Sequence, residues 1–120
     1  MAKYLEGFNV DLKQITQIAV NALENVKGEN IVVIDTNDIS PLFQRIIVCS
    51  GNSNRQVSAL ANHVVEDLKK HGVNIIGVEG RRGGEWVLVD AGDIIIHVML
   101  PKVRDYYEIE QLWQQEVNEN

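Results

Sequence analysis

The chain of 120 residues is 45% apolar and carries a formal net charge of −6, with a sequence pI of about 4.9. This length and composition suit one domain with one hydrophobic core. The acid excess argues against a broad electrostatic footprint on nucleic acid. It fits either a basic partner or a charge that serves only solubility. The single cysteine excludes an internal disulfide framework.

The first segment, residues 1–14, lacks the apolar stretch of a signal peptide and the arginines of a transit peptide. The longest apolar run, IIIHVML at residues 94–100, is about a third of the roughly 20 residues that span a bilayer. We therefore expect a cytoplasmic protein that binds no membrane.

A helix is predicted over residues 9–28, with a cap at Asn9 or Asp11 and an end at Gly28. Its apolar side chains recur at the three-to-four spacing of one helix face. They are Leu12, Ile15, Ala19, Ala22, Leu23 and Val26. The β-branched run NIVVID, residues 30–35, then predicts a buried strand.

A second strand is predicted over residues 44–50, QRIIVCS, and a second helix follows it after a cap at Ser53 or Asn54. The apolar face of this helix comprises Val57, Leu60, Ala61, Val64, Val65 and Leu68. The helix closes at His71, and VNIIGVE, residues 73–79, predicts a third strand.

The last two strands form the hairpin EWVLVDAGDIIIHVML, residues 85–100, with a two-residue turn at Ala91 and Gly92. A closing helix is predicted over residues 102–116, and we expect the tail, residues 117–120, to fray. The inward side chains of that helix are Val103, Tyr106 or Tyr107, Ile109, Leu112 and Trp113.

The predicted order of elements is α-β-β-α-β-β-β-α. It indicates a single α/β domain over residues 1–120, with one mixed sheet of about five strands and helices packed on it. At least one connection must be a crossover, because parallel strands cannot be joined by a tight turn.

The two faces of the hairpin differ in character because side chains alternate across a sheet. The predicted turn places Asp90 opposite Asp93, Leu88 opposite Ile95, and Trp86 opposite His97. One face is wholly aliphatic and must point to the core: Val87, Val89, Ile94, Ile96, Val98 and Leu100. The other face is mixed: Trp86, Leu88, Asp90, Asp93, Ile95, His97 and Met99.

The mixed face has two interpretations. It is either a second, slightly polar core layer under a helix or a partly open docking surface. A tryptophan that anchors an interface can contribute about 2 kcal/mol or more. Asp90 and Asp93 would then meet lysines or arginines of the partner, which would relieve the mild repulsion between two acids across the turn.

Cys49 and Arg55 have the spacing of cysteine-dependent phosphatases, in which loop amides and the arginine surround a phosphate that a thiolate attacks. However, the loop CSGNSNR holds one glycine, and no histidine precedes the cysteine. The alternative is structural, with Cys49 as a small core residue and Arg55 in the first turn of a helix. Nucleotidyl transfer would need an Asp-x-Asp pair for metal ions, which is missing.

The three histidines, His63, His71 and His97, form no ligand set, so we expect neither a metal nor a cofactor. The basic, glycine-rich segment GRRGG, residues 80–84, also has two interpretations. It is either a solvated loop or a contact to RNA phosphates through Arg81 and Arg82.

Three blocks of the sequence resemble the ribosomal silencing factor family, also called the Iojap-like family. They are SGNSNRQVSALANHV, GVEG…GEWVLVDAGDIIIHVM and RDYYEIEQLW, in the family's order. The resemblance runs from about residue 9 to Trp113. It implies an α/β domain that is shaped like a nucleotidyltransferase but lacks the catalytic acids, and therefore a protein that is not an enzyme.

The resemblance also implies a function. Family members bind large-subunit ribosomal protein fourteen at the surface where the small subunit would join, and they silence translation by steric exclusion when nutrients are scarce. The family's partner-binding segment matches EWVLVDAGD, and we extend the candidate site along the mixed face. The candidate residues are Trp86, Leu88, Asp90, Ala91, Asp93, His97 and Met99.

Two departures from the family pattern bear on this site. Relatives usually carry a bulkier apolar residue at the position of Ala91, and they have Thr-Asp or Ser-Asp where this chain reads PLFQR, residues 41–45. Self-association of the free protein through the Trp86 face is an alternative use of the same surface.

Overall fold

The computed structural model describes residues 11–118, with side chains for residues 11–113. The strands are β1 (Glu29–Asp35), β2 (Arg45–Ser50), β3 (Gly77–Glu79), β4 (Trp86–Asp90) and β5 (Ile94–Met99). The helices are α1 (Leu12–Asn25), α2 (Asn54–Lys70), α3 (Pro101–Tyr107) and α4 (Ile109–Asn118).

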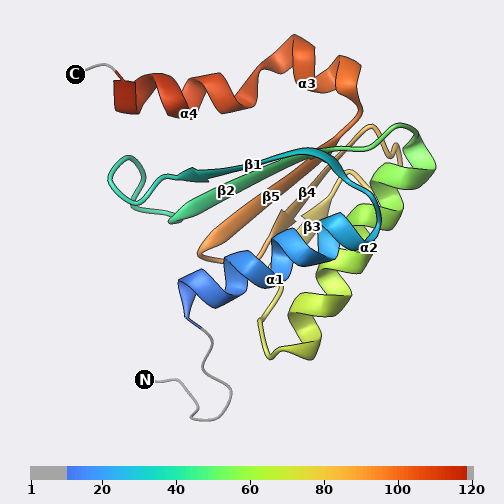
Figure 1. Cartoon of the computed structure of the whole chain (residues 1–120), viewed down its shortest axis with the longest axis horizontal. Coiled ribbons are helices and arrows are strands. Elements are labelled where there is room, and N and C mark those ends of the chain that lie inside the picture. The colour runs from blue at the N-terminus through green and yellow to red at the C-terminus, as the bar shows by residue number, and fades with distance from the viewer. Residues whose placement is uncertain (1–10, 119–120) are drawn as a thin grey trace.

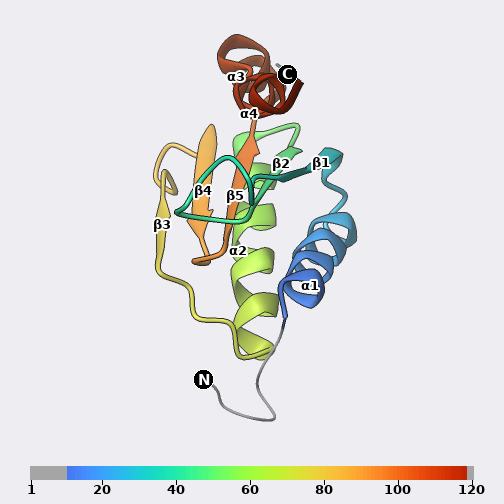
Figure 2. The ribbon, with the colours of Figure 1, turned by 90° about the vertical axis from the view of Figure 1, so that its left-hand side faces the viewer.

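The strands form one five-stranded sheet in the order β1-β2-β5-β4-β3. Strands β2 and β5 are parallel, and the other three neighbouring pairs are antiparallel. Figures 1 and 2 show α1 and α2 on one face of the sheet and α3 and α4 on the other. The predicted α/β domain with a mixed sheet is therefore confirmed.

Helix α1 begins at the predicted place because Asp11 caps it. The Gln14 backbone N–H donates to the Asp11 carboxylate (2.8 Å), and the Asp11 N–H donates to the Gln14 side chain (3.1 Å). This reciprocal pair satisfies donors that a helix N-terminus otherwise leaves free. Asn9, the other expected cap, lies outside the described residues.

Helix α2 starts in the same way, with Ser53 Oγ accepting from the Gln56 N–H at 3.1 Å. The predicted apolar faces of α1 and α2 pack against one face of the sheet. The fully enclosed residues of this core include Ala22, Leu23, Ile47, Cys49, Val57, Leu60, Val64, Val87, Ile96 and Val98. A smaller cluster on the other face contains Ile34, Ile46, Val48, Met99 and Ile109.

The hairpin turn differs from the prediction by one position. Ala91 N–H donates to the Ile94 carbonyl (3.0 Å), so the two turn residues are Gly92 and Asp93. Gly92 has a positive φ of 87°, which the first position of a type II′ turn requires and glycine adopts without strain. The predicted turn at Ala91 and Gly92 put an alanine in that place.

This correction shifts the strand register by two residues. Trp86 lies opposite Met99, Leu88 opposite His97, and Asp90 opposite Ile95. Because a shift of two preserves the alternation, the predicted membership of each face is right although the predicted partners are wrong. Asp90 and Asp93 do not face each other, so the expected repulsion between them does not arise.

The third strand and the closing helix also differ from the prediction. Only Gly77–Glu79 of the expected strand at residues 73–79 is paired. The closing segment starts at Pro101 and breaks into two helices at Glu108, which has the left-handed values φ 49° and ψ 48°. Leu112 (63% exposed) lies outward, against the prediction, and so do both Tyr106 (80%) and Tyr107 (52%), one of which was expected to face inward.

Helix α4 includes residues 117 and 118 of the expected tail, and residues 119–120 lie outside the described residues. Within residues 11–118, no helix is both long enough and apolar enough to cross a membrane.

Candidate functional site

Helices α3 and α4 cover only part of the second face of the sheet. Met99 is fully buried there, whereas Trp86 and Leu88 on β4 are half-buried. A shallow groove of about 240 Å³ is lined by Trp86, Leu88, Glu79 and Gly80, where β4 meets β3. The mixed face is therefore part core layer and part open surface.

Trp86 is held in place by polar and aromatic contacts. Its indole Nε1–H donates to His97 Nδ1 at 3.0 Å. Its ring centroid lies 5.9 Å from that of His97 and 4.9 Å from that of Tyr107. His97 on β5 and Tyr107 on α3 thus fix the orientation of the indole.

His97 is 8% exposed, and burial lowers the pKa of its imidazole from 6.5 to about 4. A neutral ring carries one proton. Because Nδ1 accepts from Trp86, that proton resides on Nε2 in this arrangement. His97 is therefore a neutral acceptor that fixes Trp86 rather than a group that charges at neutral pH.

Two tyrosines extend the open surface from β4 onto α3. Tyr107 is 52% exposed and packs against Trp86 with its ring tilted by 47°, and Tyr106 packs edge-on against Tyr107 with centroids 4.9 Å apart. We call Trp86, Leu88, Tyr106 and Tyr107 the aromatic patch. The sequence reasoning missed it because it placed one of the tyrosines inward. Adjacent residues on a helix point about 100° apart, so the pair Tyr-Tyr already signalled one exposed ring.

The acids of the predicted site lie at one end of β4. The Asp90 carboxylate accepts from the Gly92 N–H (2.9 Å) and is half-buried, so part of its hydrogen-bonding capacity supports the turn. Asp93 is exposed in the turn itself. Glu79, which the sequence reasoning did not include, adds a third carboxylate beside the groove.

Three predicted partner-binding residues are not on the free surface. Met99 is 0% exposed, His97 8% and Ala91 9%. Met99 lies in the cluster beneath α3 and α4, and His97 lies beneath Trp86. Alternation identifies a face but not what covers it. Partner binding by Met99, His97 and Ala91 stays a prediction, and the structure places all three beneath the exposed surface.

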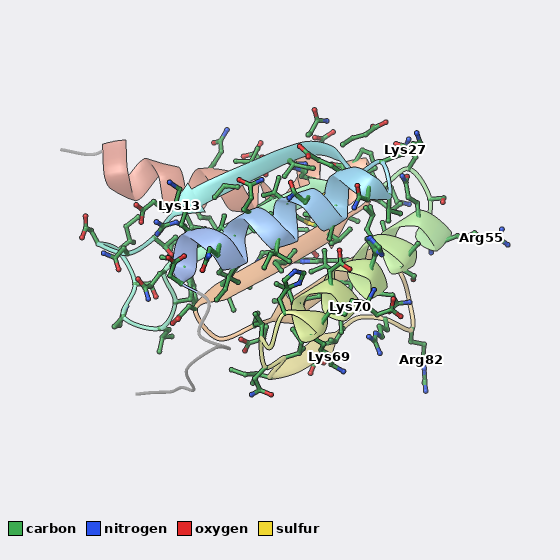
Figure 3. All side chains as sticks on the ribbon, turned by 60° about the horizontal axis from the view of Figure 1, so that its bottom comes forward. Lys13, Lys27, Arg55, Lys69, Lys70 and Arg82 are labelled. Carbon is green, nitrogen blue, oxygen red and sulfur yellow. The ribbon has the colours of Figure 1, made fainter. Side chains whose placement is uncertain are left out.

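The Cys49 loop does not have the geometry of a phosphatase. Cys49 is 0% exposed, and burial raises the pKa of its thiol from 9.0 to about 11, although the Arg104 charge lowers it in part. A thiolate nucleophile needs the opposite shift. Arg55 is exposed and points away from the molecule in Figure 3. The structural interpretation of Cys49 and Arg55 fits the observed positions.

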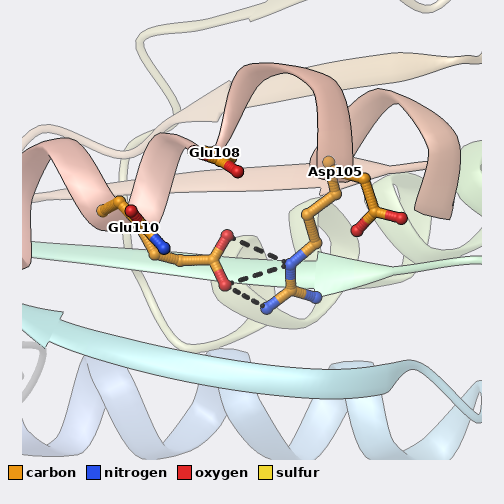
Figure 4. A pocket seen from close by; sticks show the side chains of 5 residues that line it. Asp105, Glu108 and Glu110 are labelled. Carbon is orange, nitrogen blue, oxygen red and sulfur yellow. Dashed lines mark hydrogen bonds and ion pairs between the residues drawn. The ribbon is translucent and has the colours of Figure 1, made fainter.

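A second hollow, of about 300 Å³, lies at the junction of α3 and α4. The Arg104 guanidinium there donates to both oxygens of Glu110 and to Ser50 Oγ, as Figure 4 shows for Glu110. These contacts occupy Arg104 with internal partners. In the part of the chain that the structure describes, no group of three or more His, Cys, Asp or Glu residues could hold a metal ion.

Comparisons with known proteins agree with one another. The family model described as "Ribosomal silencing factor during starvation" matches residues 9–120. A Chromobacterium violaceum protein named Ribosomal silencing factor RsfS is 57% identical over 104 residues, which is 87% of this chain and 85% of that protein. A crystal structure of a protein from the same organism has a TM-score of 0.87 at 56% identity and covers 88% of both chains.

A more distant relative comes from mouse. It is named Mitochondrial assembly of ribosomal large subunit protein 1, and it is 31% identical over 97 residues. The match covers 78% of this chain but 42% of the mouse protein.

Proposed function

The chain belongs to the ribosomal silencing factor (Iojap-like) family, and from this premise we propose that it binds the large ribosomal subunit through large-subunit ribosomal protein fourteen and blocks subunit joining. The name of the mouse relative, which refers to assembly of the large subunit, supports the large subunit as the partner, and the choice of ribosomal protein fourteen follows from the family resemblance. The proposed action is translational repression under nutrient limitation, by steric exclusion and without catalysis.

The aromatic patch is the observation that carries this proposal. Monomeric proteins bury most of their large aromatic rings, and tryptophan and tyrosine dominate the energetic centres of protein interfaces. Here the rings of Trp86 and Tyr107 pack against each other at the surface, beside a groove that can admit a partner side chain. Because His97 fixes the indole, little conformational entropy is lost when the partner docks.

The charge of the surface fits a basic protein partner. Glu79 lines the groove, and Asp90 and Asp93 lie at the far end of β4. The chain as a whole carries −6. Opposite potentials speed encounter and set orientation, and carboxylates at the rim of an apolar patch select against acidic competitors.

The dimensions of the domain suffice for steric exclusion. The molecule measures 42 × 39 × 21 Å. Direct contact between two protein surfaces requires approach to about 4 Å. A domain bound on the joining surface therefore holds the subunits apart even in its thinnest orientation.

Substitution of the central side chain tests the proposal. We expect Trp86→Ala to weaken binding to purified large subunits by about thirtyfold or more, because it removes an interface anchor of about 2 kcal/mol. Co-sedimentation of the chain with large subunits over a range of concentrations measures the change.

The matched control is Trp113→Ala, which removes the same side chain from the packing against Phe43 under α4. We expect this variant to unfold more easily but to bind large subunits at wild-type strength while folded. Equal affinity of Trp86→Ala and wild type would contradict the proposed anchor.

A further inference from the structure

Four cationic side chains of this acidic protein lie at one end of the molecule. Figure 3 shows Lys27, Arg55 and Arg82 projecting from the same end, and Arg81 precedes Arg82 in the same exposed loop. They come from three separate segments: the residues after α1, the first turn of α2, and the loop between β3 and β4. We call these four residues the cationic end.

Hydrogen bonds tie the three segments together. On one side of Arg55, Asn54 Nδ2 donates to the Gly83 carbonyl in the β3–β4 loop (2.8 Å). On the other side, Gln56 Nε2 donates to the Lys27 carbonyl (3.1 Å). The first turn of α2 therefore fixes the backbone of both neighbouring cationic segments, which makes the cationic end one surface rather than three independent loops.

The four cations have no internal ion-pair partner among the side chains of residues 11–113, where the ion pairs are Arg45–Asp35, His63–Asp67 and Arg104–Glu110. Within segments 26–29, 52–56 and 79–85, the four cations outnumber the three acids by one. The rest of the chain therefore carries −7, given the total of −6. The cationic end is a local exception to the charge of the protein.

The chemistry of the cationic end fits phosphate groups. Three of its four cations are arginines, whose planar guanidinium donates in pairs to phosphate oxygens. The acidic remainder of the protein would be repelled by a polyanion, so the cationic end is where we expect contact with nucleic acid. The loop with Arg81 and Arg82 starts at Gly80, which also lines the groove beside Trp86. The cationic end thus adjoins the aromatic patch.

We propose that the cationic end contacts the phosphate backbone of ribosomal RNA while the aromatic patch docks on ribosomal protein. This inference rests on the proposed binding to the large subunit. The large subunit presents RNA next to its proteins, so one bound domain can meet both. The contact is to the backbone and carries no base specificity.

The salt dependence of binding tests the contact. The double variant Arg55→Gln/Arg82→Gln is compared with Lys69→Gln/Lys70→Gln, which alters the other end of α2 (Figure 3). Each variant moves the net charge from −6 to −8 by removing two cations. Affinity for purified large subunits is measured from about 50 to 200 mM salt.

We expect the arginine variant to bind more weakly at low salt and to lose about two from the slope of log affinity against log salt, because each phosphate contact contributes about 0.9 for a duplex. The lysine variant should keep the wild-type slope. Equal slopes for wild type and the arginine variant would overturn the inference.

A crosslink identifies what the cationic end touches. Gly83→Cys places a thiol beside Arg82 at a position with open space around the new side chain, and the natural Cys49 is buried. A photo-crosslinker on that thiol should attach to ribosomal RNA in the bound complex. Attachment to ribosomal protein alone would overturn the assignment to RNA.

Trp86→Ala separates this inference from the proposed function. If both hold, that variant loses affinity at every salt concentration but keeps the slope. If Trp86→Ala abolishes binding and the arginine variant changes nothing, the cationic end has no role and the proposed function stands. If wild type does not bind large subunits at all, both proposals fail.

Discussion

At the scale of single residues, the contact between Trp86 and His97 determines how the aromatic patch is presented. The donor is an indole N–H and the acceptor is a buried imidazole nitrogen, 3.0 Å away. Protonation of His97 would put a second donor at the position of the acceptor and place a charge in a buried site. The orientation of Trp86 is therefore linked to the protonation state of His97.

This linkage predicts a loss of stability in mild acid. The folded pKa of His97 is about 4, below its ordinary value of 6.5, because burial disfavours the charged ring. Between these values the unfolded chain binds more protons, so the free energy of unfolding falls as the pH falls. We expect His97 to account for a loss of about 2 kcal/mol between pH 8 and pH 5.

Denaturant unfolding of the wild type and of His97→Asn at both pH values isolates this contribution. The asparagine side chain can still accept a hydrogen bond from Trp86 but does not titrate in this range. The free energy of unfolding of His97→Asn should therefore fall by about 2 kcal/mol less than that of the wild type between pH 8 and pH 5. His71→Asn, at an exposed position, is the control for the substitution of a histidine by asparagine. Parallel curves for wild type and His97→Asn would show that His97 is not the responsible group.

Residue-level sequence reasoning succeeded for Cys49, which follows an apolar, β-branched run on a strand that is buried on both faces. Cys49 alternates with Ile47 along β2, and both are fully buried as predicted. Alternation also assigned Met99 to the correct face, but it did not show that the residue is fully covered there, because the position of α3 and α4 over that face depends on the break at Glu108. The sequence gives no strong signal for that break, since glutamate is an ordinary helix residue.

At the scale of secondary-structure elements, Arg104 fastens the closing helices to the sheet. Its guanidinium donates to Glu110 on α4, across the break at Glu108 (Figure 4), and also to Ser50 at the end of β2. Arg104 is 8% exposed, so these contacts replace water around a buried charge. The neighbouring turn of α3 carries Tyr106 and Tyr107, so the fastening also positions half of the aromatic patch.

We expect Arg104→Met to lower the free energy of unfolding by about 3 kcal/mol, because it leaves the Glu110 carboxylate without its partner in a mostly buried position. Arg45→Met is the matched control. It breaks the ion pair with Asp35, whose side chain is 67% exposed, and should lower the free energy of unfolding by less than about 1 kcal/mol. Denaturant unfolding of both variants measures the difference, and equal losses would contradict the role assigned to Arg104.

Element-level prediction was accurate where caps and periodicity agree. The capping residues Asp11 and Ser53 and the apolar faces of α1 and α2 follow directly from local rules. The hairpin register was wrong by two residues because the sequence offers two glycine-containing turns, and the pairing of Gly92 with Asp93 wins by putting the glycine where φ is positive.

At the scale of the whole molecule, the two faces of the sheet are covered unequally. Helices α1 and α2 cover one face with a continuous core, whereas α3 and α4 leave the β4 side of the other face open. The order of elements and the mixed sheet were predictable from chain pattern. How much of the second face α3 and α4 cover was not predictable, because it depends on where the helices lie in space and not on their length.

A protein that silences by occupying a surface must act in proportion to its amount. Under the proposed mechanism, one bound domain would block one large subunit, and nothing would be consumed or modified. With subunits well above the dissociation constant, we expect joined ribosomes to decrease linearly as the chain is added and to reach a minimum near one chain per large subunit. Sucrose-gradient sedimentation of reconstituted subunits measures this titration.

The time course distinguishes steric exclusion from catalysis. At about one chain per hundred large subunits, steric exclusion leaves almost all subunits able to join at any time, because each chain occupies only one subunit and does not modify the others. An enzyme at the same ratio would continue to act and would deplete joined ribosomes progressively. Progressive depletion would therefore refute exclusion by bulk. Under exclusion, Trp86→Ala should require a higher concentration for the same effect, because only the occupancy of the joining surface has changed.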